Sequence, residues 1–168
     1  GTYPLPEAQL DRFMFKVLVH SPSLAEMTAI LDRTTGAAAP TARKVIDRPA
    51  LLAMRDLVRE VPAAAHVKEY IGRLVLATHP GSPLEIEATR KYIRYGASPR
   101  AAQSILLAAK VGALRQGRYN VAFADVRRAA LPALRHRLIL NFEGEAEGIR
   151  TDAIIEQVLQ TVPETPGA

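Results

Sequence analysis

The sequence of 168 residues contains no cysteine and no tryptophan, and only 5% of its residues are aromatic. The absence of cysteine excludes disulfides, thiolate metal sites and cysteine nucleophiles. Few aromatic side chains are left to stack on bases, which argues against a nucleic-acid module. No apolar run approaches the roughly 20 residues of a membrane-spanning helix, and no signal peptide opens the chain, so we expect a cytoplasmic protein without membrane contact.

The four histidines lack the spacing of a metal site. His20, His66, His79 and His136 form no H-x-x-x-H pair, and no set of carboxylates surrounds them in the sequence. Such residues are more often structural or exposed than ligands. We therefore expect no metal site in this chain.

What the sequence does contain is the material of a helical domain. It is 48% hydrophobic and 23% charged, and alanine, leucine and arginine are abundant, which favours helices over sheets. The apolar spacing and the positions of Gly and Pro predict a mainly α fold, a bundle of about six helices with short loops. The main predicted helices are one through residues 24–31 that Gly36 ends, then 48–61, 64–78, 99–116, one from about residue 123, and 151–162. Short helices are predicted at residues 6–12 and 84–93. We expect Pro132 to kink or interrupt its helix, and residues 34–44 and 141–148 to be loops.

Residues 13–19 follow a different period. Phe13, Phe15, Val17 and Val19 are apolar at every second position, which predicts a β-strand. The sequence offers no partner strand, and a single strand is not stable by itself. We therefore expect this strand to belong to the edge of a larger sheet domain that precedes the chain.

The segment from Gly96 to Arg100 predicts a helix start with an unusual charge. Ser98 is suited to cap the helix and Pro99 to occupy its first position. Arg100 in the first turn opposes the positive end of the helix dipole, at a cost of about 0.3–1 kcal/mol. Free amides, the dipole and a guanidinium at one place would bind an anion such as phosphate. The alternative is an exposed arginine that tolerates its position.

The net charge of +5 is distributed unevenly along the chain. Residues 81–140 have a net charge of +8, whereas residues 141–168 have a net charge of −5. A basic surface suits a polyanion, either a nucleotide or a nucleic acid. A solvated basic face without a ligand is the alternative.

Two motifs, in this order and with helices between them, resemble the MoxR family of AAA+ ATPases. The first is GTYPLPEAQLDRF at residues 1–13, which resembles the segment that follows sensor 1 in the family. The second is GASPRA at residues 96–101, which resembles sensor 2 in the family's lid. Residues 117–119 (GRY) and 134–138 (LRHRL) also match the lid, so the resemblance covers nearly the whole chain.

The resemblance implies roles for two arginines. Arg12 matches the arginine finger, a catalytic residue that acts on the nucleotide bound by a neighbouring subunit. Arg100 matches sensor 2, which contacts phosphate from the lid within the same subunit and couples lid position to the nucleotide state. A salt bridge to Glu7 or Asp11 is the alternative role of Arg12. The other residues that the motif assigns to nucleotide binding are Gly96, Ser98 and Pro99.

The resemblance also implies a division of the chain and a set of partners. Residues 1–20 would be the end of the α/β AAA+ core, with the finger helix and the last strand, and residues 21–168 the helical lid. The complete protein would bind ATP with Mg²⁺, form a homo-oligomer such as a hexamer, and in some relatives act with a von Willebrand factor A domain partner. Its role would be the chaperone-like assembly or activation of other proteins.

Several parts of an ATP site are missing from the sequence. It has no G-x-x-x-x-G-K-[ST] loop, no apolar strand that ends in paired acids, and no sensor 1 asparagine. We therefore expect the chain to need the missing N-terminal nucleotide-binding domain as a partner. By itself it should neither bind ATP tightly nor hydrolyse it.

The chain also departs from the family at two places. Many relatives have Ala-Thr-Arg where this chain has Ala77-Thr78-His79, so a role of that arginine is in doubt here. A common Thr-Pro-Glu-Asp helix start is replaced by residues 122–125 (AFAD), which weakens the cap but keeps Asp125 in the first turn.

Two other functions remain open on the sequence alone. Residues 81–140 could be a basic helical module that binds nucleic acid, although no recognition helix with its turn is evident. Residues 141–168 could bind a basic partner protein in an interaction bundle. The strand at residues 13–19 favours the ATPase lid, because only a sheet outside this chain could pair with it. Pairing of that strand within this chain would argue against a fragment.

Overall fold

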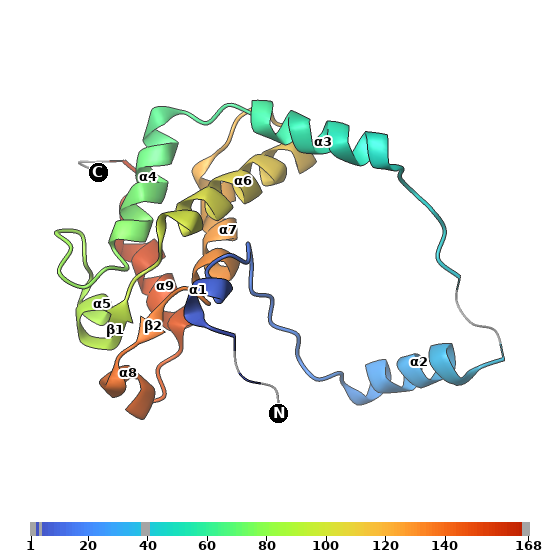
Figure 1. The fold of residues 1–168 in the computed structure, drawn as a ribbon, viewed down its shortest axis with the longest axis horizontal. Helices are drawn as coiled ribbons and strands as arrows, with labels where there is room; N and C mark the ends of the chain where they lie inside the picture. Colours follow the sequence, from blue (N-terminus) through green and yellow to red (C-terminus); the bar gives the residue numbers. More distant parts are fainter. Residues whose placement is uncertain (1–2, 4, 38–40, 166–168) are drawn as a thin grey trace. The chain divides into compact units, whose positions relative to one another are not determined.

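The computed structural model describes residues 3, 5–37 and 41–165, which fall into two compact units. One unit comprises Gly1–Lys16 together with Leu57–Ala168, and the other comprises Val17–Asp56. The ribbon in Figure 1 follows both units through the sequence. The division between core and lid that we expect after residue 20 stays a prediction.

The unit of residues 17–56 contains helix α2 (Leu24–Thr35) and the start of helix α3 (Arg48–Glu60). Ser23 caps α2, because its hydroxyl accepts the Glu26 N–H at 3.3 Å while the Glu26 carboxylate accepts the Ser23 N–H at 2.8 Å. Asp47 accepts the Ala50 N–H at 2.9 Å and so begins α3. Both helices were predicted at these places. The predicted loop at 34–44 lies partly outside the described residues.

Four helices build the larger unit: α4 (Ala65–Leu76), α6 (Pro99–Arg115), α7 (Phe123–Leu134) and α9 (Thr151–Thr161). Helix α6 packs against both α4 and α7, and α9 packs against α7 (Figure 1). Alanines occupy much of the α6–α7 contact and let the two helices approach closely. The buried alanines are Ala101, Ala109 and Ala113 on α6 and Ala129, Ala130 and Ala133 on α7. The predicted mainly α bundle is confirmed.

The helical period also predicted the core. The predicted buried face of α4 is the observed one: Val67, Tyr70, Ile71, Leu74 and Val75. On α9, three of the four predicted apolar residues are buried and Leu159 is half-buried. These side chains drive folding because each removes apolar surface from water, at about 25 cal/mol per Å².

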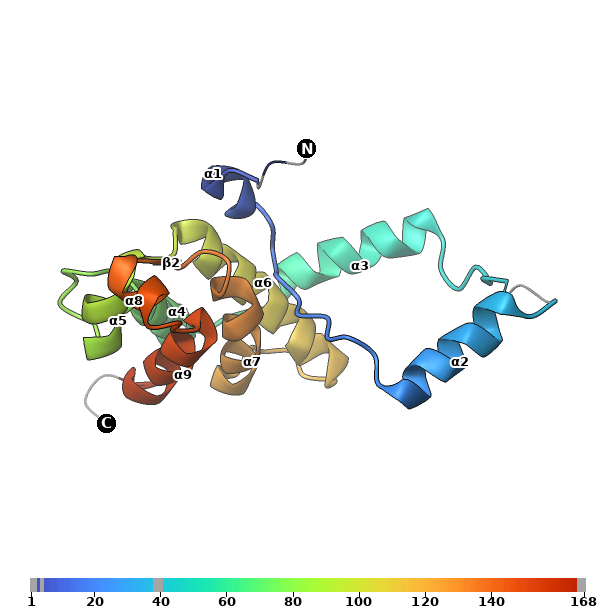
Figure 2. The same cartoon turned by 90° about the horizontal axis from the view of Figure 1, so that it is seen from below.

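A small antiparallel sheet was not predicted. Strand β1 (Ile93–Tyr95) pairs with β2 (Ile139–Leu140), with Ile93 opposite Leu140 and Tyr95 opposite Ile139. The short helices α5 (Glu87–Tyr92) and α8 (Phe142–Ala146) flank this sheet, and both views place them at the same end of the bundle (Figures 1 and 2). We expected a loop where α8 forms.

The predicted strand at residues 13–19 is not formed, although helix α1 (Glu7–Leu10) before it is. Its alternating pattern has no partner strand in the part of the chain that the structure describes. Lys16 instead donates its backbone N–H to the Pro132 carbonyl at 3.0 Å. Pro132 also does not end α7, which continues to Leu134, because Ala133 and Leu134 are fully buried and hold the last turn in place.

Candidate functional site

Helix α6 begins as the sequence predicts. Ser98 is extended at φ −70° and ψ 168°, and its hydroxyl accepts the Arg100 N–H at 3.2 Å, with Pro99 in the first turn. The Ala101 N–H donates to the Ser98 carbonyl at 2.9 Å. These two amides therefore already have acceptors, contrary to our expectation of free amides. The guanidinium of Arg100 is the group of this segment that is left to contact an anion.

The loop before α6 is held by the C-terminal end of α4. The buried Thr78 hydroxyl accepts the Ala97 N–H at 3.0 Å and donates to the Val75 carbonyl at 2.6 Å. His79 Nε2 lies 2.9 Å from the Ala97 carbonyl, to which it can only donate. His79, which stands where many relatives have arginine, thus helps to position the loop that carries Arg100.

Gly96 allows this loop to lie directly on α4. A Cβ atom at this position would be 2.5 Å from the Thr78 carbonyl oxygen and 2.9 Å from Cδ2 of His79. A backbone oxygen cannot move aside as a flexible side chain can. Glycine is therefore required here by close approach, not by an unusual backbone angle.

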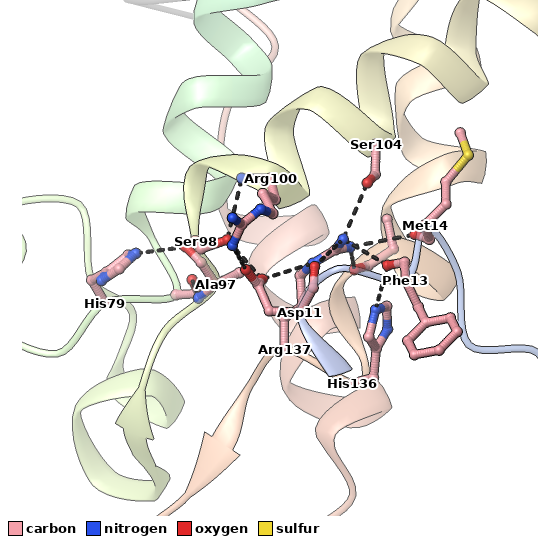
Figure 3. A network of polar contacts seen from close by, with 12 residues as sticks. Asp11, Phe13, Met14, His79, Ala97, Ser98, Arg100, Ser104, His136 and Arg137 are labelled. Carbon is pink, nitrogen blue, oxygen red and sulfur yellow. Dashed lines mark hydrogen bonds and ion pairs between the residues drawn. The ribbon is translucent and has the colours of Figure 1, made fainter. Parts of the chain in front are cut away.

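Asp11 connects the start of the chain to the start of α6 (Figure 3). Its carboxylate accepts hydrogen bonds from Ser98 Oγ at 2.7 Å, from Arg100 at 2.9 Å and from Arg137 Nε at 3.1 Å. Burial alone would raise the pKa of Asp11, but these three hydrogen bonds outweigh it and lower the pKa. Asp11 is therefore a carboxylate shared by two arginines.

Arg137 lies at the centre of the same network and is buried, with 1% of its side chain exposed. Besides the Asp11 carboxylate, it donates to the carbonyls of Asp11 (2.9 Å), Phe13 (2.7 Å) and Met14 (3.3 Å). It also donates to the Ala133 carbonyl and to Ser104 Oγ at 3.1 Å. All three of its nitrogens have acceptors, so the buried charge is both paired and hydrogen-bonded (Figure 3).

Arg12 and Arg100 differ from Arg137 in their exposure. The side chain of Arg100 is 58% exposed and its guanidinium has the single ionic partner Asp11. Arg12 is exposed, and within the described residues its side chain makes no ion pair or hydrogen bond. The alternative salt bridge from Arg12 to Glu7 or Asp11 is not formed, because Asp11 is already bound to the two other arginines.

Sequence reasoning assigned no role to Arg137 and gave Asp11 only as a possible salt-bridge partner of Arg12, although a signal existed for Arg137. Ala130, Ala133, Leu134 and Arg137 follow the spacing of one helix face, which places an arginine on an apolar stripe. A charged residue at such a position needs a buried partner. The partner itself, Asp11, lies 126 residues away and could not be read from local pattern.

The acidic residues of 141–168 are partly used within the unit. Lys91 lies 3.4 Å from Glu143 and 3.3 Å from Glu147, and Arg135 lies 2.9 Å from Asp152. These pairs join α8 and α9 to basic residues of the bundle. Part of the negative charge of this segment is thus balanced inside the chain.

The hollows of the larger unit show where a ligand has room. A cleft of about 650 Å³ lies beside the Asp11 network, lined in part by Gly96, Ser98 and His136. A second hollow of about 550 Å³ between α6 and α7 contains none of the predicted site residues. Across the described residues, no three His, Asp or Glu side chains gather as metal ligands would. Nor does any described helix have the length and apolarity needed to cross a bilayer.

Comparison with known proteins gives the class of this bundle. Residues 86–158 match the family model described as the AAA lid domain. Chaperone MoxR1 of Mycobacterium tuberculosis is 37% identical over 162 residues, which are 96% of this chain and 43% of the relative. The uncharacterised protein YeaC of Bacillus subtilis is 34% identical over 96% of this chain and 48% of its own length. The solved structure of a proposed ATPase from Cytophaga hutchinsonii superposes with a TM-score of 0.89 at 37% identity, covering 97% of this chain and 50% of that one.

The bundle that carries Gly96–Arg100 is therefore an AAA lid domain. Over nearly its whole length the chain is similar to MoxR proteins, which is consistent with the segment of a MoxR-family AAA+ ATPase that the two motifs indicate. It spans about half the length of the relatives that it matches.

Proposed function

We propose that this chain supplies the lid and the arginine finger of a MoxR-type AAA+ ATPase. In this proposal Arg12 stabilises the charge that develops on the phosphates of a nucleotide held by a neighbouring subunit. Arg100 contacts phosphate from the lid as sensor 2, and Gly96, Ser98 and Pro99 set its position. ATP hydrolysis would drive the chaperone-like assembly or activation of partner proteins.

The observation that carries the proposal is the exposure of both guanidinium groups. A structural arginine is buried and saturated with acceptors, as Arg137 is. Arg100 is more than half exposed and has one ionic partner, and Arg12 has no side-chain partner within the described residues. An exposed guanidinium group is planar and can donate two charge-assisted hydrogen bonds to the oxygens of a phosphate.

The residues present fit one side of an ATP site. ATP with Mg²⁺ would supply the phosphate to be transferred, and Arg100 would have to exchange the Asp11 carboxylate for a phosphate oxygen. The exchange would leave the Asp11 carboxylate bound to Ser98 and Arg137, and the Arg100 side chain is already 58% exposed. The phosphate loop and the magnesium ligands must come from the missing nucleotide-binding domain, the first partner of this chain.

The further partners follow from the same family. A finger that acts between subunits requires a homo-oligomer, and we propose a hexameric ring. A von Willebrand factor A domain protein is the partner class that we propose for the complete assembly. A location in the cytoplasm accords with such a role.

A chimera tests the proposed function. This chain would replace the matching segment of the M. tuberculosis relative, and ATP hydrolysis would be measured for the parent chimera and its variants. We expect Arg12→Ala to lower kcat by about 10³-fold, the range of an arginine finger. Arg100→Ala should lower kcat/KM by at least about tenfold, as for loss of a charge-assisted phosphate contact.

Arg94→Ala is the matched control. Arg94 is an exposed arginine of β1 that lies over the Tyr95 ring and belongs to neither motif. Its loss should leave kcat and KM within about twofold, as expected for a surface change. An active chimera whose hydrolysis survives both Arg12→Ala and Arg100→Ala would contradict the proposal.

A further inference from the structure

Arg137 differs from the other arginines of the network in what it holds. Three of its acceptors are backbone carbonyls of the segment 11–14, which we call the finger segment because it includes Arg12. Its acceptors outside this segment, Ser104 and Ala133, belong to α6 and α7. The guanidinium is thus a bridge between the finger segment and the two central helices of the lid.

This bridge replaces the secondary structure that the segment lacks. Residues 11–14 follow α1 and belong to no helix or strand. His136 Nε2, 3.0 Å from the Phe13 carbonyl, is a second donor there, but among the described residues only Arg137 donates to the Asp11 and Met14 carbonyls. Backbone groups that leave water need a partner, and a buried guanidinium offers five donors in a fixed plane.

The bridge cannot exchange in the way that the Arg100–Asp11 pair can. Release of the finger segment would leave the buried Arg137 charge without Asp11 and without three carbonyls. Stranding a buried charge is strongly unfavourable. Departure of Arg100 strands none, because Arg100 is 58% exposed and Asp11 keeps its bonds to Ser98 and Arg137. When Arg100 changes partner, the segment therefore stays bound through Arg137.

We propose that Arg137 is a positioning residue that fixes the finger segment to the lid, so that Arg12 and Arg100 move together with the lid as one body. Its significance for catalysis rests on the proposed function, but the attachment itself does not. Arg137 touches no reacting group in this view. It acts through the backbone of residues 11–14, and Asp11 completes the attachment from the segment's side.

The test measures the attachment without nucleotide. Because the chain has no cysteine, Arg12→Cys and Lys68→Cys introduce two unique sites for nitroxide labels, one on the finger segment and one on the exposed side of α4. In the otherwise unchanged chain we expect one narrow distribution of label distances. A broad distribution there would overturn the proposal without any further variant.

Arg137→Met keeps the length of the side chain and removes its donors. We expect the label distances to spread, and amide exchange of Asp11, Arg12 and Phe13 to accelerate by at least about tenfold, as expected for lost bonds to a charged group. Exchange in α4 should not change. Unchanged distances and exchange in a folded Arg137→Met chain would overturn the proposal.

Three further variants separate the attachment from general stability. Arg137→Lys keeps the charge with fewer donors and should give an intermediate effect; it decides the matter if Arg137→Met does not fold. Arg73→Met removes a different guanidinium, whose acceptors are the carbonyls of Pro163 and Glu164, and should leave the finger segment unchanged. Arg100→Met should also leave it attached. If Arg100→Met released the segment and the Arg137 variants did not, Arg100 would be the residue that holds it, and the proposal would be overturned.

The two levels of the proposal can fail separately. Persistent attachment together with a chimera that ignores Arg12→Ala would refute the finger role and keep the positioning role. If the attachment did not depend on Arg137 but the chimera needed Arg12, the positioning role would be refuted and the finger role kept.

Discussion

At the scale of single residues, Gly96 determines how closely the Arg100 loop can approach α4. The hydrogen bonds of Thr78 and His79 to Ala97 form only if the backbone at Gly96 lies against the Thr78 carbonyl. A side chain at this place would push the loop away and break both contacts. The position of Arg100, the proposed phosphate-binding arginine, thus depends on the absence of a side chain at Gly96, four residues before it.

We expect Gly96→Ala to lower the free energy of unfolding by about 2 kcal/mol, in the range of overpacked sites. Thermal and urea denaturation of the chain would measure it. Gly72→Ala is the control with the opposite sign, since nothing lies within 4 Å of its added Cβ and the residue is inside α4. That change should stabilise the chain by about 0.5–1 kcal/mol. Equal effects of the two substitutions would contradict the close approach at Gly96.

At the scale of elements, the sequence pattern predicted where helices form better than it predicted which elements contact each other. Apolar spacing located α4 and its buried face because a helix buries every third or fourth residue. The β1–β2 pair was missed, since Ile93 and Leu140 meet only when the bundle is folded. The strand expected at 13–19 does not form within the described chain, because an alternating pattern cannot create a partner, and its pairing with a sheet outside this chain stays a prediction. At the site, the start of α6 was predicted, but the link from Asp11 to Arg137 was not.

Helix α7 illustrates how a weak cap is compensated by a buried ion pair. Its N-cap is Ala122, which has no side-chain acceptor, but the buried Asp125 carboxylate accepts the Ala122 N–H at 2.9 Å. Asp125 also accepts two hydrogen bonds from Arg118, at 2.7 and 2.9 Å. Burial alone would raise the pKa of Asp125, but the hydrogen bonds from Arg118 and Ala122 outweigh it and lower the pKa from 3.8.

This arrangement predicts a dependence on pH. A carboxyl group whose pKa is lower in the folded than in the unfolded state stabilises the fold fully above the unfolded pKa and loses that effect as pH falls through the folded pKa. Asp125→Asn should therefore cost about 2–3 kcal/mol at pH 7 and progressively less below about pH 4. Urea denaturation between pH 7 and pH 2 would measure the difference. The exposed Asp56→Asn, which removes a partner of Arg55, should change stability by less than about 0.5 kcal/mol at every pH.

At the scale of the whole molecule, the chain contains some parts of the proposed ATP site and not others. The chain contains the lid, in which Arg100 is exposed while the neighbouring Arg137 is buried with acceptors for all its nitrogens. The printed sequence contains no G-x-x-x-x-G-K-[ST] loop, whose backbone N–H groups hold the phosphates in such sites. One guanidinium that must first leave Asp11 is a weak substitute for that loop. Binding energy for the nucleotide should therefore come from a domain other than this one.

We accordingly expect this chain alone to release no phosphate from Mg²⁺–ATP and to bind a fluorescent ATP analogue too weakly to saturate. Titration of the analogue, with a DNA duplex in parallel at fixed salt, would measure both affinities, since a basic protein binds DNA more tightly as salt falls. Salt-sensitive DNA binding without nucleotide binding fits a lid that is separated from its phosphate loop. Micromolar nucleotide binding that Arg100→Ala abolishes would show that the chain holds more of the site than Arg12 and Arg100. DNA binding that survives high salt would instead favour a nucleic-acid function for the basic residues 81–140, because contacts other than phosphate charge would then carry the affinity.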